Sequence, residues 1–229
     1  MGVDEKMKPA KLAIIHTTPV TVDTMKALAG EILPGVEIIN FVDDSILPQL
    51  ASNGGNLADV QERWTAYAKF AEQQGATCIL SACSSVGEAA EAARREVGVP
   101  VLRIDEAMAE EAAARGSRIG IAATLASTLQ PTARLIERKA RELGTHPQIR
   151  QALASGAYRL LMDGDREGHN RVLAETLLEL ADSVDVVVLA QASMAGAVES
   201  LPEHLRPKFL TSPRSGMKLV ARRMAVAGA

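Results

Sequence analysis

Two strand-like segments in the first half of the chain recur in the second half at nearly the same distance. Lys11–Thr17 resembles Arg118–Thr124, 107 residues later, and Thr77–Gly87 resembles Asp185–Ala195, 108 residues later. Two matches in the same order and at nearly equal spacing indicate an internal duplication. The 229 residues are enough for two small α/β units with a sizeable core, so we expect two similar units facing one cleft.

The duplication is not symmetric at the end of its second segment. It places Cys83 on Gln191 and Ser85 on Ser193, each at the point where an apolar run stops. One unit therefore presents a thiol where the other presents an amide. This difference limits the chemistry of the cleft more than any other feature of the sequence.

Short β-branched runs alternate with longer Ala/Glu/Arg-rich segments, which is typical of βα units around a parallel sheet. The predicted strands are 11–15, 36–41, 77–82, 101–103, 118–122, 186–190 and a short piece near Phe209. The predicted helices are 21–32, 57–74, 86–97, 106–115, 131–143, 149–162, 166–181 and an amphipathic 216–227.

Composition and charge exclude several classes of partner. Aromatic residues make up only 3% of the chain and the net charge is −3, which argues against nucleic acid and anionic membranes. No apolar run is long enough to span a membrane, the first residues are polar, and two cysteines make no disulfide framework. We expect a cytoplasmic protein, a homo-oligomer, that binds a small molecule.

In parallel sheets, ligands bind beyond the carboxyl ends of the strands. The four strand ends of the two units carry small polar side chains followed by helix starts, where free backbone N–H groups favour anions. The predicted substrate-binding residues are Thr17, Thr18, Ser84, Ser85, Thr124, Gln191 and Ser193. Each hydroxyl taken alone is equally explained as a helix cap, but their convergence predicts a site for a small carboxylate.

Cys83 is the predicted catalytic residue, because a thiol before a helix start is expected to have a lowered pKa and to act as base or nucleophile. Cys78 lies inside the apolar run and is expected to be inert core. No metal-like spacing and no nucleotide-binding motif is present, so neither a metal nor a cofactor is predicted. His16 and Asp44 lie close to strand ends and are left open as contributors.

These segments together resemble the aspartate/glutamate/hydantoin racemase superfamily over nearly the whole chain. The resemblance is carried by Ile15–Pro19, Ala82–Glu88, Gly98–Val101, Arg118–Thr124 and Leu189–Met194. It implies two similar flavodoxin-like or Rossmann-like α/β domains with parallel sheets, related by a pseudo-twofold axis, with the active site between them. The implied domains are 1–100 plus 208–229, with a returning last helix, and 101–207.

Family racemases work without a cofactor and use two cysteines on opposite faces of the substrate. By position, Cys83 corresponds to the first cysteine, Ser84 and Ser85 to carboxylate-binding residues, and Thr17 and Thr124 to the first-strand ends. The second cysteine position holds Gln191, and an amide near pH 7 neither accepts nor delivers a proton usefully. Two-base inversion therefore lacks one of its groups.

The resemblance implies a cofactor-independent racemase or isomerase that acts on a small carboxylate or related carbonyl compound through Cys83. Two alternatives stay open at this point. One is a lyase or decarboxylase in which Cys83 protonates an enediolate, and the other is a small-ligand binder without catalysis.

Overall fold

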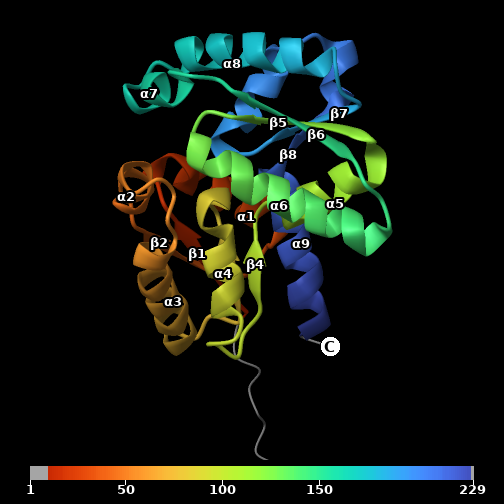
Figure 1. Ribbon diagram of the computed structural model, residues 1–229. Helices are drawn as coiled ribbons and strands as arrows, with labels where there is room; N and C mark the ends of the chain where they lie inside the picture. Colours follow the sequence, from red (N-terminus) through yellow and green to blue (C-terminus); the bar gives the residue numbers. More distant parts are fainter. Residues whose placement is uncertain (1–9, 228–229) are drawn as a thin grey trace, which may run out of the picture.

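The computed structural model describes residues 10–227 and contains two four-stranded parallel sheets (Figure 1). The first sheet has the order β2-β1-β3-β4, with β1 Lys11–His16, β2 Glu37–Val42, β3 Cys78–Ser81 and β4 Val101–Arg103. The second has the order β6-β5-β7-β8, with β5 Arg118–Ala123, β6 Gln148–Leu153, β7 Val186–Leu189 and β8 Phe209–Thr211. The same order occurs twice, which confirms the predicted α/β fold of two similar parallel-sheet units.

Helices cover both faces of each sheet. The α-helices are α1 Val22–Ile32, α2 Ile46–Ser52, α3 Ala58–Gln73, α4 Gly87–Ala93, α5 Glu106–Arg115, α6 Ala126–Leu143, α7 Ala157–Met162, α8 Arg166–Ala181 and α9 Ser212–Ala227. Short 3-10 helices are η1 Pro19–Thr21, η2 Ser84–Val86, η3 Ala192–Ser200 and η4 Glu203–Lys208. None of the helices between residues 10 and 227 is both long enough and apolar enough to span a bilayer.

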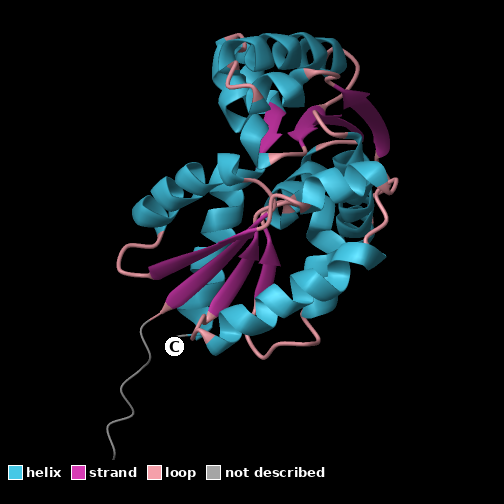
Figure 2. Cartoon of the chain, turned by 90° about the vertical axis from the view of Figure 1, so that its left-hand side faces the viewer, coloured by secondary structure: helices cyan, strands magenta, loops and turns pink. Residues whose placement is uncertain are grey.

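The central strands are apolar on both sides because each is covered on both faces. In β1, Leu12 and Ile14 pack toward α1 and α9, whereas Ala13 and Ile15 pack toward α2, α3 and α4. In the second half, one face of the sheet packs against α8 and η3 and the other against α5 and α6. Figure 2 shows the strands of the first sheet converging on the boundary between the halves.

Three sequence predictions were wrong in detail. The predicted helix 149–162 is strand β6 followed by the short helix α7, because β6 is an edge strand with exposed Gln148, Arg150 and Gln151 and lacks an apolar signature. Helix α6 begins at Ala126 and contains Pro131, which the sequence placed at its start. Helix α2 was not predicted, because it is only seven residues long and contains Pro48.

The strand pairing differs from the predicted domain boundaries by a few residues at two places. Strand β4 pairs with β3, so the first sheet extends to Arg103, and β8 pairs with β7, so the second sheet extends to Thr211. The chain therefore crosses from the first sheet to the second after Arg103 and crosses back after Thr211. These crossings lie in contact, since a Cβ atom at Gly216 would come within 2.4 Å of the Ile104 carbonyl oxygen.

Candidate active site

The carboxyl ends of both sheets open on one pocket. Seven of the eight predicted site residues line it: Thr17, Thr18, Cys83, Ser84, Ser85, Gln191 and Ser193. Thr124 lies behind the lining and contacts Gln191 instead. Thr21, Leu47, Ala82, Leu125, Tyr158 and Ala192 complete the lining. Residues of both halves therefore line one pocket.

The pocket is narrow in this structure. Its space for water-sized molecules is about 30 Å³, enough for one or two waters, so a larger substrate requires the cleft to widen. A larger hollow of about 450 Å³ adjoins it and shares Thr21, Ala192 and Ser193 with it. A substituent on a substrate therefore has room beside the pocket.

Cys83 lies two residues after the end of β3 and is partly buried at the pocket, whereas Cys78 is fully buried within the strand. Burial raises the pKa of the Cys83 thiol, and it outweighs Thr17, Ser85 and the Val86 backbone N–H, which favour the thiolate. The expected lowering of this pKa is therefore wrong, because burial outweighs the nearby donors at the start of η2 and α4. Thiolate formation here depends on the surrounding donors.

The carbonyl oxygen of Gln191 is fully used by its own half of the protein. Its Oε1 accepts hydrogen bonds from the Thr124 backbone N–H (2.6 Å), the Thr124 hydroxyl (2.9 Å) and the Leu125 backbone N–H (3.2 Å). The amide NH₂ is left to face the pocket. Gln191 can therefore donate hydrogen bonds to a substrate oxygen. It cannot take a proton from the substrate or transfer one to it.

The hydroxyls of the first half differ in their contacts. Ser85 Oγ lies 3.1 Å from Thr128 Oγ1 and 3.5 Å from Ser127 Oγ on α6, so it connects the two halves. The hydroxyls of Thr17 and Ser84 are buried and have no partner within normal hydrogen-bond distance. Thr17 lies near the Cys83 sulfur and Ser84 near the Asp105 carboxylate, so each buried hydroxyl can turn toward that neighbour or toward a carboxylate bound in the pocket that both residues line.

Neither His16 nor Asp44 lines the pocket. His16 is buried, and its Nδ1 lies 2.9 Å from Thr21 Oγ1 while its Nε2 lies 3.0 Å from Asn40 Oδ1. Nε2–H donates to Asn40, so Nδ1 accepts from the Thr21 hydroxyl, which does line the pocket. Asp44 is exposed in the turn after β2. His16 thus orients a pocket hydroxyl, and Asp44 has no contact with the site.

Burial lowers the pKa of His16, although the bond to Asn40 opposes this, so the folded protein keeps the imidazole neutral below the ordinary value of 6.5. Below that pH the unfolded chain binds a proton that the folded chain does not, so stability falls as pH falls. His16 adds at most about 1.4 kcal/mol per pH unit to the slope of the free energy of unfolding against pH. Urea unfolding at several pH values should show a shallower dependence of the free energy of unfolding on pH for His16→Gln than for the wild type. The exposed control His204→Gln should keep the wild-type dependence. The same dependence in all three proteins would contradict this.

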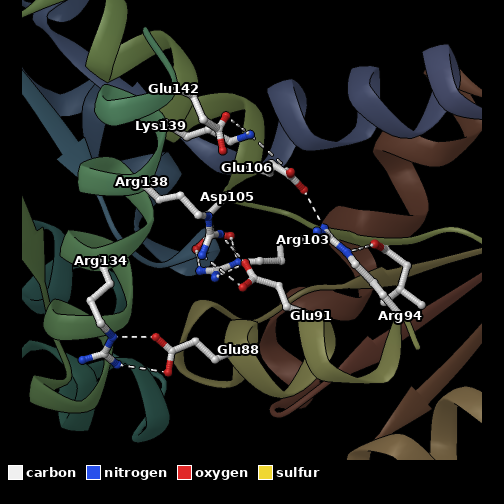
Figure 3. A network of polar contacts seen from close by, with 11 residues as sticks. Glu88, Glu91, Arg94, Arg103, Asp105, Glu106, Arg134, Arg138, Lys139 and Glu142 are labelled. Carbon is white, nitrogen blue, oxygen red and sulfur yellow. Dashed lines mark hydrogen bonds and ion pairs between the residues drawn. The ribbon is translucent and has the colours of Figure 1, made fainter. Parts of the chain in front are cut away.

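A network of ion pairs connects α4 of the first half with α6 of the second half (Figure 3). Arg103 and Asp105 are buried and form a two-bond pair at 2.9 and 2.8 Å, and Arg103 also bonds Glu91 at 2.8 Å. Glu91 on α4 in turn pairs with Arg138 on α6. Gly87 permits this packing, because a Cβ atom there would lie 2.2 Å from the Arg103 guanidinium carbon.

Six lining residues were not among the predicted site residues: Thr21, Leu47, Ala82, Leu125, Tyr158 and Ala192. Tyr158 has an ionisable hydroxyl, and it was hidden because β6 was interpreted as helix. The strand repeat contains the signal for it. β2 and β6 are 111 residues apart, so Leu47 and Tyr158, each five residues after its strand, are equivalent positions.

Comparison with solved structures shows the same fold over almost the entire chain. A glutamate racemase from Bacillus anthracis superposes with a TM-score of 0.77 at 18% identity, covering 96% of this chain and 83% of that one. An allantoin racemase from Klebsiella pneumoniae gives 0.66 at 20% identity, covering 95% and 89%. An aspartate racemase homologue from Pyrococcus horikoshii gives 0.59 at 16% identity, covering 96% and 99%.

No curated protein sequence matches the chain. The family model described as Asp/Glu/Hydantoin racemase matches residues 14–220, which includes all four strand ends of the pocket. The chain belongs to the Asp/Glu/hydantoin racemase family and is a racemase-type isomerase.

Proposed function

We propose that this protein racemises or isomerises a small carboxylic acid or related carbonyl compound without a cofactor, with Cys83 as the acid/base group. The observation that carries the proposal is the position of Cys83 in a pocket lined by uncharged donors. Thr17, Ser84 and Gln191 line the pocket together with Cys83, and no charged side chain is among the lining residues. Neutral donors of this kind suit a carboxylate whose charge grows during reaction.

In this mechanism the Cys83 thiolate removes the α-hydrogen of the bound acid as a proton. The C–H bond breaks, its electron pair enters the enediolate, and an S–H bond forms. The hydroxyls and the Gln191 NH₂ stabilise the two enediolate oxygens, because hydrogen bonds to developing negative charge are stronger than those to the ground state. Return of a proton to the α-carbon completes the reaction.

The raised pKa of Cys83 supports a second candidate function. A thiol that stays protonated near neutral pH is suited to deliver a proton rather than to remove one. In a decarboxylase, loss of carbon dioxide from a malonic acid would supply the enediolate, and Cys83 would protonate it. No base is needed for the first step of that reaction.

The test uses pure enantiomers of glutamate, aspartate and allantoin, which the names of similar structures suggest, together with phenylmalonate. In D2O we expect at least one enantiomer to exchange its α-hydrogen for deuterium, followed by proton NMR, with inversion followed by optical rotation. Carbon dioxide release from phenylmalonate, without exchange in the other probes, would favour the decarboxylase. Tight binding of a probe with neither reaction would instead indicate a binding protein.

A further inference from the structure

The lining of the pocket contains few groups that can exchange a proton. Its side chains are hydroxyls of Ser and Thr, apolar groups, one amide, one thiol and one phenol. Among the described residues that line it, Cys83 and Tyr158 alone have a proton that can be lost within the range reached by protein groups. A reaction that moves protons at two faces of a substrate therefore has one ionisable group from each half.

The internal repeat shows that these two ionisable residues occupy different positions in the two halves. Cys83 follows β3 and its equivalent after β7 is Gln191, whereas Tyr158 follows β6 and its equivalent after β2 is Leu47. Each half thus has one ionisable residue and one that cannot ionise, but at exchanged positions. After its third strand the second half has an amide where the first half has a thiol, and after its second strand it has a phenol where the first half has a leucine.

The surroundings of Tyr158 fit a role in the pocket. The side chain is partly buried on α7, and its hydroxyl is near the hydroxyl of Thr18. Burial raises the pKa of Tyr158 above its ordinary value of 10, and negative charge on Cys83 raises it further, while Thr18 opposes both. The phenol therefore stays protonated when Cys83 is a thiolate, and the two groups are close enough to affect each other's charge.

We propose that Tyr158 is the second proton-transfer residue of this site and delivers its hydroxyl proton to the substrate face opposite Cys83. The proposal rests on the proposed function. Cys83 thiolate takes the α-proton and becomes a thiol. The Tyr158 O–H bond breaks, its proton bonds to the α-carbon of the enediolate, and the phenolate remains. After product release, the thiol returns its proton to solvent and the phenolate takes one from solvent, which restores the starting state.

Tyr158→Phe separates the two halves of the reaction. In D2O, we expect inversion of the reactive probe enantiomer to fall by about 100-fold or more, the usual contribution of a general acid. Deuterium exchange with retained configuration should continue, because Cys83 can still remove and return hydrogen on its own face. The matched control is Tyr67→Phe, since the Tyr67 hydroxyl bonds Asp43 at 2.9 Å outside the pocket. Unchanged inversion in Tyr158→Phe, or equal loss of inversion and exchange, would overturn the proposal.

A second measurement needs no substrate. The chain has two tyrosines, so Tyr67→Phe leaves Tyr158 as the single tyrosine, whose ionisation can be followed by tyrosinate absorbance. Adding Cys83→Ala should lower the titration midpoint of Tyr158, because the neighbouring negative charge is removed, whereas Cys78→Ala should leave it in place. An unchanged titration midpoint of Tyr158 on removal of Cys83 would refute the pairing of these two residues, that is, their electrostatic interaction across the pocket. If no probe exchanges with wild-type protein but the midpoint shifts, the proposed function fails and the pairing stands.

Discussion

Cys83→Ala is expected to reduce α-hydrogen exchange of the reactive probe by about 10²–10⁴-fold, because the thiolate is the group that breaks the C–H bond. The fold should be preserved, since the side chain is small and lies at the edge of a core, where it also lines the pocket. Exchange is measured by proton NMR in D2O, and folding by circular dichroism and urea unfolding.

The other cysteine supplies the matched control. Cys78→Ala removes a thiol of the same type from the interior of β3, where its pKa is raised to about 12 by burial, so it is inert at neutral pH. We expect normal exchange in this variant, with at most a modest loss of stability. Equal exchange in Cys83→Ala and wild type would remove Cys83 from the mechanism.

Arg103→Met is expected to destabilise the protein by about 3–5 kcal/mol, the typical cost of leaving one partner of a buried ion pair uncompensated. Asp105 has a fully buried carboxylate, and Arg103 holds the pKa of that carboxyl below its usual range against the effect of burial. Without the guanidinium, the carboxylate has lost its counterion and Glu91 has lost a partner. Urea unfolding at neutral pH measures the change.

The exposed pair in the same network is the control. Arg134 and Glu88 also connect α6 to α4, but both are solvent-accessible, so Arg134→Ala should cost about 0–1 kcal/mol. Arg103→Met combined with Asp105→Leu should recover part of the loss, since an apolar pair leaves no unpaired charge. A loss for Arg103→Met no larger than for Arg134→Ala would mean that burial does not control this pair.

The strands that the sequence predicted well are the central ones. They are buried on both faces and therefore form continuous apolar runs: β1, β3, β5 and β7. The internal repeat was recognised in the sequence as the pair β1 and β5 and the pair β3 and β7. β6 is an edge strand with three exposed polar residues, and its alternation is too weak to separate from a helix. That one misassignment also concealed Tyr158.

The site was predictable to the extent that it follows strand ends. Cys83 and Gln191 are adjacent to buried strands, and the rule for parallel sheets places them at the pocket. The bond from Thr124 to Gln191 joins side chains far apart in sequence. The contacts of His16 with Thr21 and of Arg103 with Asp105 join near neighbours, but they depend on side-chain orientations and burial that residue type alone does not determine. Local patterns contain no information on such contacts.

The two adjoining crossings have a consequence for synthesis on the ribosome. Residues 106–211 form the second half as one continuous stretch, whereas the first half needs α9, which follows the second half in the sequence, to cover β1 and β3. Because chain segments fold as units while they emerge, the second half can complete its core first. The first sheet keeps one apolar face open until α9 has been synthesised, so the docking of α9 is the step that protects the nascent first half from aggregation.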